Sequence, residues 1–197
     1  MNWDWDDLPE KYADLYPEEE RMKRDKHRAQ GLANKREGES FEFHIEAALL
    51  RYKEAGIAEI EKTPEPIKQI GKPNHKGQFL ACYIKKAQPD FKGTIRGGQS
   101  IVFEAKSTIQ DKIEQKVVTK DQSDRLEAHS KLGALAFVVV NMSSQNRIYR
   151  VPWNVWRDMK RIYGRKSMNH YELEPYRIRW RDGMIQLLDG IEKGATP

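Results

Sequence analysis

The chain has 197 residues, a formal net charge of +5 and a sequence pI near 9.1. This length suits one domain with an appendage, and the mild excess of base fits a nucleic-acid partner without proving one. The single cysteine, Cys82, excludes an intrachain disulfide and a cysteine-based zinc site, which fits a reducing compartment. The acidic start lacks the apolar region of a signal peptide, and no apolar run approaches the ~20 residues of a membrane span. We therefore expect a cytoplasmic protein with no membrane partner.

The first 36 residues have the composition of a charged arm. Residues 1–20 hold eight acids and one base, whereas residues 21–36 hold seven bases and one acid. Few aliphatic residues follow Tyr16, so this segment cannot build a core by itself. One interpretation is a basic arm that lies on DNA phosphates, and the other is a solvated, partly helical tail. The bases are Arg21, Lys23, Arg24, Lys26, Arg28, Lys35 and Arg36.

The body of the chain, residues 37–197, is predicted to begin with an amphipathic helix. Its apolar residues recur at positions i, i+4, i+7, i+8 and i+11, and Gly56 ends it. Glu42 lies on the flank of this stripe, where a glutamate is most often simply solvated. The stripe consists of Phe41, Ile45, Ala48, Leu49 and Tyr52.

Three strands are predicted next. Residues 57–62 alternate as a strand, and two prolines then force an extended path. Residues 67–70 and 78–84 follow as two strands joined by the turn-rich segment 71–77, which makes a long hairpin. Phe79 and Tyr83 are four apart, so they share one face of it. The lysines of this hairpin are Lys68, Lys72, Lys76, Lys85 and Lys86.

The clearest chemistry follows in residues 89–106. Glu104 and Lys106 are two apart in the apolar strand 101–106, so they project to the same face, opposite Phe103. A hairpin between the two strands would bring Asp90 beside Glu104. Two converging carboxylates make a hard-oxygen site for Mg²⁺, and a lysine beside the metal can orient the attacking water. The alternative is an edge strand with exposed charges.

The turn of this second hairpin is assigned to glycines. Gly93, Gly97 and Gly98 lie between Asp90 and the strand 101–106. After Lys106, residues 107–116 are polar and are predicted to be a loop.

A helix and a buried strand complete the core pattern. Thr119 and Gln122 match a capping box that opens a helix to Leu132, closed by Gly133. Gln122 therefore has a structural interpretation, in which its side chain reaches back to the cap. Residues 134–140 are a continuous apolar run, which predicts a central strand buried on both faces.

The remaining elements are shorter. Residues 145–151 are predicted to be a strand, and Pro152 lies in the first turn of a short helix. Residues 164–167 form a basic loop. Residues 176–181 and 184–188 are expected to pair around the turn at 182–183.

With its elements and candidate site residues in this order along the sequence, the chain resembles the RecU family of Holliday junction resolvases, within the PD-(D/E)xK nuclease superfamily. The similar segments span residues 38 to about 190. They are Gly38–Glu42, Lys62–Ile67, Phe103–Lys106, Gln122 and Gly164–Ser167.

The resemblance implies a fold and an activity. The fold is α/β: a mixed central sheet flanked by helices, as in restriction endonucleases, with residues 67–88 as a protruding stalk that reaches into the junction centre. The activity is Mg²⁺-dependent symmetric nicking of four-way DNA junctions in recombination by a homodimer, with Mn²⁺ as a substitute ion. Residues 1–36 remain an arm outside this nuclease domain of residues 37–197.

The resemblance also implies roles for individual residues. Asp90 and Glu104 are the metal ligands and Lys106 is the catalytic lysine. Glu42 and Gln122 are further residues of the catalytic site. The expected DNA contacts are Lys68, Lys72, Lys76, Lys85, Lys86, Arg21, Arg24 and Arg28.

Two departures from the family pattern and two rival functions stay open. The family tends to have two threonines before the aspartate, where this chain has Gln88 and Pro89, and an aspartate where it has Val102. One rival is another nuclease of the superfamily that acts on flaps or duplex DNA. The other is a non-catalytic DNA-structure binding protein.

For the stalk, the hypothesis is that the stalks of the two subunits pair in the dimer and bury Phe79 and Tyr83. The alternative is a hairpin packed on its own subunit.

Overall fold

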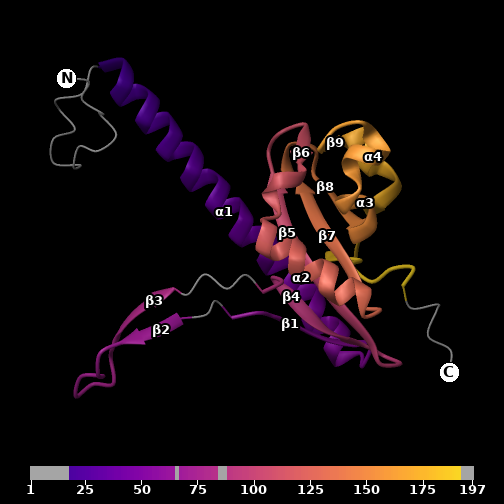
Figure 1. The fold of residues 1–197 in the computed structure, drawn as a ribbon, viewed down its shortest axis with the longest axis horizontal. Helices are drawn as coiled ribbons and strands as arrows, with labels where there is room; N and C mark the ends of the chain where they lie inside the picture. Colours follow the sequence, from indigo (N-terminus) through magenta and orange to yellow (C-terminus); the bar gives the residue numbers. More distant parts are fainter. Residues whose placement is uncertain (1–17, 65–66, 84–87, 192–197) are drawn as a thin grey trace.

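A six-stranded mixed sheet forms the centre of the protein. The structure is a computed structural model that describes residues 18–64, 67–83 and 88–191, apart from the side chains of Tyr83 and of several residues in the first helix. The strand order is β1-β4-β5-β7-β8-β10, and all neighbours are antiparallel except β5 and β7 (Figure 1). The strands are β1 (Ala58–Lys62), β4 (Phe91–Ile95), β5 (Gln99–Thr108), β7 (Leu135–Met142), β8 (Arg147–Pro152) and β10 (Arg177–Ile178).

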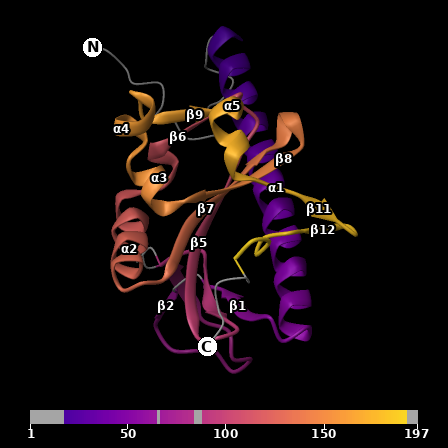
Figure 2. The same ribbon diagram turned by 90° about the vertical axis from the view of Figure 1, so that its right-hand side faces the viewer.

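Helices cover both faces of this sheet (Figure 2). The long helix α1 (Glu18–Glu54) packs on one face together with the hairpin of β11 (Trp180–Arg181) and β12 (Met184–Ile185). The second face carries α2 (Lys120–Lys131), α3 (Trp153–Arg157) and α4 (Met159–Tyr163), and the short α5 (His170–Leu173) follows β9 (Ser167–Asn169). The prediction of an α/β fold with a mixed sheet flanked by helices is confirmed.

Side chains that alternate along the central strands form two hydrophobic cores, one on each face of the sheet. On the α1 face the rings of Phe91, Phe103 and Phe137 stack with centroids 4.8 and 4.9 Å apart. On the α2 face Val102 and Val138 pack below the helices. Because β7 contributes to both cores, the prediction of a central strand buried on both faces is confirmed.

The helix α1 is much longer than the stripe at residues 41–52 predicts. It runs for 37 residues without a break, and its amino-terminal half extends away from the sheet (Figure 1). Met22 and Leu32 are exposed there. Residues 1–17 lie outside the described part of the chain, and the division into an arm and a nuclease domain stays a prediction.

The predicted stalk is present as a two-stranded sheet of β2 (Ile67–Ile70) and β3 (Leu80–Tyr83). It extends from the body on the same side as the free half of α1 (Figure 1). The strand β3 is shorter than the predicted 78–84, so Phe79 precedes it and is 44% exposed. The side chain of Tyr83 is not described, and the proposed burial of Phe79 and Tyr83 between two stalks stays a prediction.

The assignment of Gly93 to the turn is wrong. Residues 96–98 form the turn, and Gly93 lies inside β4, opposite Ile60 of β1. A Cβ atom at this position would stand 2.1 Å from the carbonyl oxygen of Glu59. The glycine is therefore required by the close approach of two strands.

Two further segments differ from the prediction. Residues 107–116 are not a loop: β5 continues to Thr108, and β6 (Lys112–Glu114) then pairs with the distant β9 before a 3₁₀ turn at 115–117. The predicted strand 176–181 is divided, because Arg177–Ile178 pairs with β8 whereas Trp180–Arg181 pairs with β12. In both segments the pairing partner decides the structure.

Candidate active site

Asp90 and Glu104 stand opposite each other on neighbouring strands. The register of β4 and β5 pairs Phe91 with Phe103, so the next pair outward is Asp90 and Glu104. The backbone N–H of Asp90 donates to Glu104 Oε1 at 3.3 Å. Directly opposed residues of an antiparallel pair project to the same face, which here is the α2 face. The predicted convergence of the two carboxylates is therefore present.

Lys106 lies between these carboxylates. Its Nζ is 3.2 Å from Asp90 Oδ2 and 3.0 Å from Glu104 Oε2. The Ala105 N–H also donates to Asp90 Oδ2, at 3.0 Å, which fixes the carboxylate on the strand. The Glu104 side chain is fully buried, while those of Asp90 and Lys106 remain 26% and 19% exposed. The site is thus buried at Glu104 and open to solvent at Asp90.

Gln122 joins this cluster from the first turn of α2. Its Nε2 donates to Glu104 Oε2 through a short hydrogen bond. Its Oε1 accepts from the backbone N–H of Thr119 at 3.0 Å, and the Thr119 hydroxyl accepts from the Gln122 backbone N–H in return. The capping box predicted from sequence is confirmed. The same amide therefore caps α2 and contacts the buried carboxylate.

Burial governs the ionisation of the site. Together with the neighbouring Asp90 carboxylate, it raises the pKa of Glu104 to about 8, against the opposing effect of the Lys106 ammonium. Burial alone would lower the pKa of Lys106, but the charges of Asp90 and Glu104 outweigh it and the pKa is raised. The buried carboxyl thus holds a proton unless more positive charge stands beside it.

The donor set fits a divalent cation. The hydrogen bonds from Ala105 and Lys106 to the Asp90 carboxylate both end on its Oδ2. Carboxylate oxygens are the ligands that Mg²⁺ prefers, and it commonly keeps several waters. Among residues 18–64, 67–83 and 88–191 no group of three or more His, Cys, Asp and Glu side chains could hold a metal. Asp90 and Glu104 would therefore share the ion with water or substrate oxygens.

The structure does not bring Glu42 into this cluster. Its Oε2 forms an ion pair with Lys62 Nζ at 2.7 Å, and Lys62 also reaches Glu46 at 3.0 Å. The hydrogen bonds to these two carboxylates raise the pKa of Lys62 above its ordinary value. The pair lies on the α1 face, opposite to Glu104. Sequence reasoning named Lys62 only within a family segment and did not foresee this contact.

The predicted DNA-binding residues divide into three groups. Lys68, Lys72 and Lys76 are exposed along β2 and the stalk turn, and no ion pair within the described residues engages them. Arg28 is exposed on the free half of α1. The remaining four, Lys85, Lys86, Arg21 and Arg24, have side chains outside the described part.

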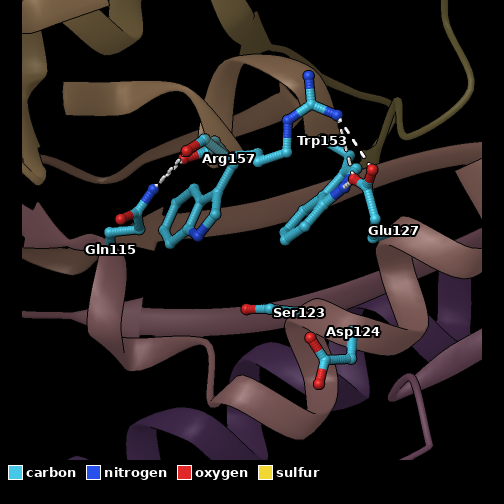
Figure 3. Close-up of a pocket in the computed structure, with 7 residues that line it drawn as sticks. Gln115, Ser123, Asp124, Glu127, Trp153 and Arg157 are labelled. Carbon is cyan, nitrogen blue, oxygen red and sulfur yellow. Dashed lines mark hydrogen bonds and ion pairs between the residues drawn. The ribbon is translucent and has the colours of Figure 1, made fainter. Parts of the chain in front are cut away.

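A pocket of about 300 Å³ lies between α2 and α3 and is lined by none of these catalytic candidates (Figure 3). Trp153 Nε1 donates to Glu127 Oε2 at 2.7 Å, and Arg157 Nη1 donates to the same oxygen at 3.1 Å. These bonds tie α3 to α2 (Figure 3). The pocket wall therefore holds the helix that carries Gln122 in place.

A family model and a relative of known identity both point to the RecU family. The family described as "RecU: Recombination protein U" matches residues 36–193. The Holliday junction resolvase RecU of Geobacillus sp. (strain WCH70) is 29% identical over 147 residues, which are 71% of this chain and 73% of that protein. The solved structure of Hjc, a Holliday junction resolvase of Archaeoglobus fulgidus, covers 73% of this chain and 91% of its own, with a TM-score of 0.44 and 14% identity. In the described part, no helix is long and apolar enough to cross a bilayer.

Proposed function

The chain belongs to the RecU family of Holliday junction resolvases, and on that basis we propose that it resolves four-way DNA junctions by metal-dependent, symmetric nicking during recombination. The observation that carries this proposal is the convergence of Asp90, Glu104 and Lys106 on one strand face. That arrangement suits phosphodiester hydrolysis better than a merely structural charge cluster. A fully buried glutamate beside a second carboxylate costs stability, and a divalent cation would add to the positive charge of Lys106 that offsets this cost.

Resolvases of this family use a divalent metal, and we propose Mg²⁺ as the ion, with Mn²⁺ as a substitute. When bound, the ion would supply Lewis-acid stabilisation of the phosphate and a more acidic water. Asp90 and Glu104 would hold it. Lys106, already within hydrogen-bonding distance of both carboxylates, would orient the attacking water and favour its ionised form. Gln122 keeps Glu104 turned towards the site.

The substrate should be branched DNA bound by a homodimer in the cytoplasm. A four-way junction has two-fold symmetric nicking sites, so a C2 dimer places one active site on each of two strands. The exposed lysines of the stalk, Lys68, Lys72 and Lys76, supply positive charge at a distance from the nicking site. Their position suits contact with phosphates around the junction centre.

A cleavage assay tests this proposal. Wild-type protein is mixed with a synthetic four-way junction or with linear duplex of the same sequence, with and without Mg²⁺. The expected result is paired nicks in the junction only when Mg²⁺ is present. Equal cutting of the duplex would favour another nuclease of the superfamily, and tight junction binding without any cleavage would favour a binding protein.

A further inference from the structure

Thr63 continues the β1–β4 pairing by one residue beyond the strand. The register pairs Lys62 with Phe91, so the next pair outward is Thr63 and Asp90. The backbone N–H of Thr63 donates to the carbonyl oxygen of Asp90 at 2.8 Å, as that register requires. Thr63 is therefore fixed beside the first carboxylate of the site.

The side chain of Thr63 projects to the catalytic face. Lys62 points towards α1, where it binds Glu42 and Glu46. Successive residues of an extended chain point to opposite faces, so Thr63 faces the side that carries Asp90 and Glu104. The three side chains of Thr63, Asp90 and Glu104 form one row across three adjacent chain segments.

The Thr63 hydroxyl is buried and has no hydrogen-bond partner among the described residues. Its Oγ1 is shielded from solvent and makes no hydrogen bond within the described part of the chain. A buried hydroxyl without a partner costs free energy, whereas valine of nearly the same shape would not incur that cost. The hydrogen bonds that Ala105 and Lys106 donate to the Asp90 carboxylate both end on Oδ2. The row thus presents a hydroxyl without a partner among the described residues, in register with the Asp90 carboxylate.

The segment before Asp90 offers no hydroxyl of its own. Gln88 is exposed, and its Oε1 accepts from Lys92 at 2.9 Å, while Pro89 is buried and has no polar side chain. Among these neighbours of Asp90, Thr63 therefore carries the hydroxyl that lies in register with the carboxylate.

We propose that Thr63 is a positioning residue whose hydroxyl donates to an oxygen of the loaded active site, either a water held next to Asp90 by the metal or a non-bridging oxygen of the phosphodiester. This inference rests on the proposed function. The hydroxyl orients that oxygen against the Asp90 side of the site. It adds no charge and does not take part in proton transfer.

The test compares Thr63→Val, which removes the hydroxyl at constant shape, with Thr63→Ser, which keeps it. Thr94→Val is the matched control, because Thr94 is an exposed threonine of β4. For each variant the melting temperature is measured without metal and with Mg²⁺, and kcat and KM are measured on a four-way junction. If Thr63→Val does not fold, Thr63→Ala is compared with Thr63→Ser instead.

The expected result is that Thr63→Val melts about 2–4 °C higher than wild type without metal, because the unpaired hydroxyl is gone. Its kcat should fall about tenfold with little change in KM. Thr63→Ser should keep the wild-type kcat, and Thr94→Val should change neither quantity.

The metal measurement separates the two oxygen sources. A smaller rise in melting temperature on adding Mg²⁺ without DNA would assign the hydroxyl to a metal-bound water. A rise in melting temperature equal to that of wild type, together with a lower kcat, would assign the hydroxyl to the phosphodiester. A Thr63→Val protein with wild-type kcat and a wild-type response to Mg²⁺ would overturn the inference. If wild type itself nicks no junction, the proposed function fails, and the response to Mg²⁺ alone then decides the role of Thr63.

Discussion

The side chain of Gln122 donates to the buried carboxylate of Glu104, while its own oxygen accepts from the N–H that opens α2. One amide therefore couples the start of a helix to the deepest group of the site. The structural and catalytic interpretations of Gln122 do not exclude each other. They can be separated by substitution, because only one of them needs an amide N–H.

Gln122→Glu should keep the helix cap and impair the site. Glutamate is a favoured residue at this position of a capping box, so α2 should retain its start. Glu104 would lose a donor and face another carboxylate, and we expect the single-turnover nicking rate to fall about tenfold or more. Gln122→Ala should lower the rate and also destabilise the protein by about 0.5–1 kcal/mol, because the cap is removed. A Gln122→Glu protein with wild-type nicking would leave Gln122 as a cap alone.

The raised pKa of Glu104 predicts a pH-dependent stability of the metal-free protein. Its pKa is about 8 in the folded protein and 4.5 as an ordinary glutamate, so the folded state binds the proton more tightly. The stabilising effect is complete below pH 4.5, falls as the pH rises and is lost above about pH 8. The loss should be on the order of 5 kcal/mol, because the side chain is fully buried and solvent does not screen it.

Urea unfolding in the presence of a chelator measures this effect. The unfolding midpoint of wild type should fall between about pH 5 and about pH 8.5, and the fall should be much smaller for Glu104→Gln. Added Mg²⁺ should flatten the wild-type profile, because a cation favours the ionised carboxylate. Matching profiles for wild type and Glu104→Gln would show that Glu104 does not titrate in this range.

The stalk lysines should distinguish junctions from duplex. Lys72 and Lys76 lie in the exposed turn that joins β2 and β3. Replacing both with alanine should weaken binding to four-way junctions strongly and to linear duplex little, because only a junction has a central opening to enter. Lys131 and Lys160, which are exposed on α2 and α4, provide a matched double-alanine control. An equal loss of affinity for both substrates would make the stalk lysines generic phosphate ligands.

The basic segment 21–36 should bind phosphates through the projecting half of α1. Deleting residues 1–36 leaves the part of α1 that packs on the sheet, from Phe41 to Tyr52. Junction affinity should fall, and the slope of log affinity against log salt should flatten by roughly 0.9 for each phosphate that the shortened protein no longer neutralises. An unchanged slope would identify the segment as a tail that does not touch DNA.

Local patterns predicted the geometry of the strand that carries Glu104 and Lys106 well. The alternation in residues 101–106 placed Glu104 and Lys106 on one face, and a short hairpin sufficed to bring Asp90 opposite Glu104. The capping box at Thr119 likewise depends on residues three apart. Each of these features is set by neighbours in the chain, so the sequence alone determines it.

Features that depend on distant segments could not be predicted in this way. Gly93 looked like a turn residue, but its role is to admit the backbone of β1, an approach visible only in three dimensions. The strand β6 was missed because it pairs with β9, more than 50 residues later. The buried hydroxyl of Thr63 gave no signal either, since a threonine at the end of a strand is ordinary and only its register with Asp90 singles it out.

The central claim is that Asp90 and Glu104 hold a divalent metal that cleaves the junction with Lys106. The most direct test is the single-turnover nicking rate of a four-way junction in Mg²⁺ for Asp90→Asn, with Asp111→Asn, an exposed aspartate, as the control. Asp90→Asn should abolish nicking while junction affinity survives, because affinity rests on basic residues elsewhere. Lys106→Ala should lose about 10²-fold or more in rate without losing metal affinity, and Asp111→Asn should cleave like wild type. Full nicking by Asp90→Asn in Mg²⁺ would show that Asp90 does not hold the catalytic metal.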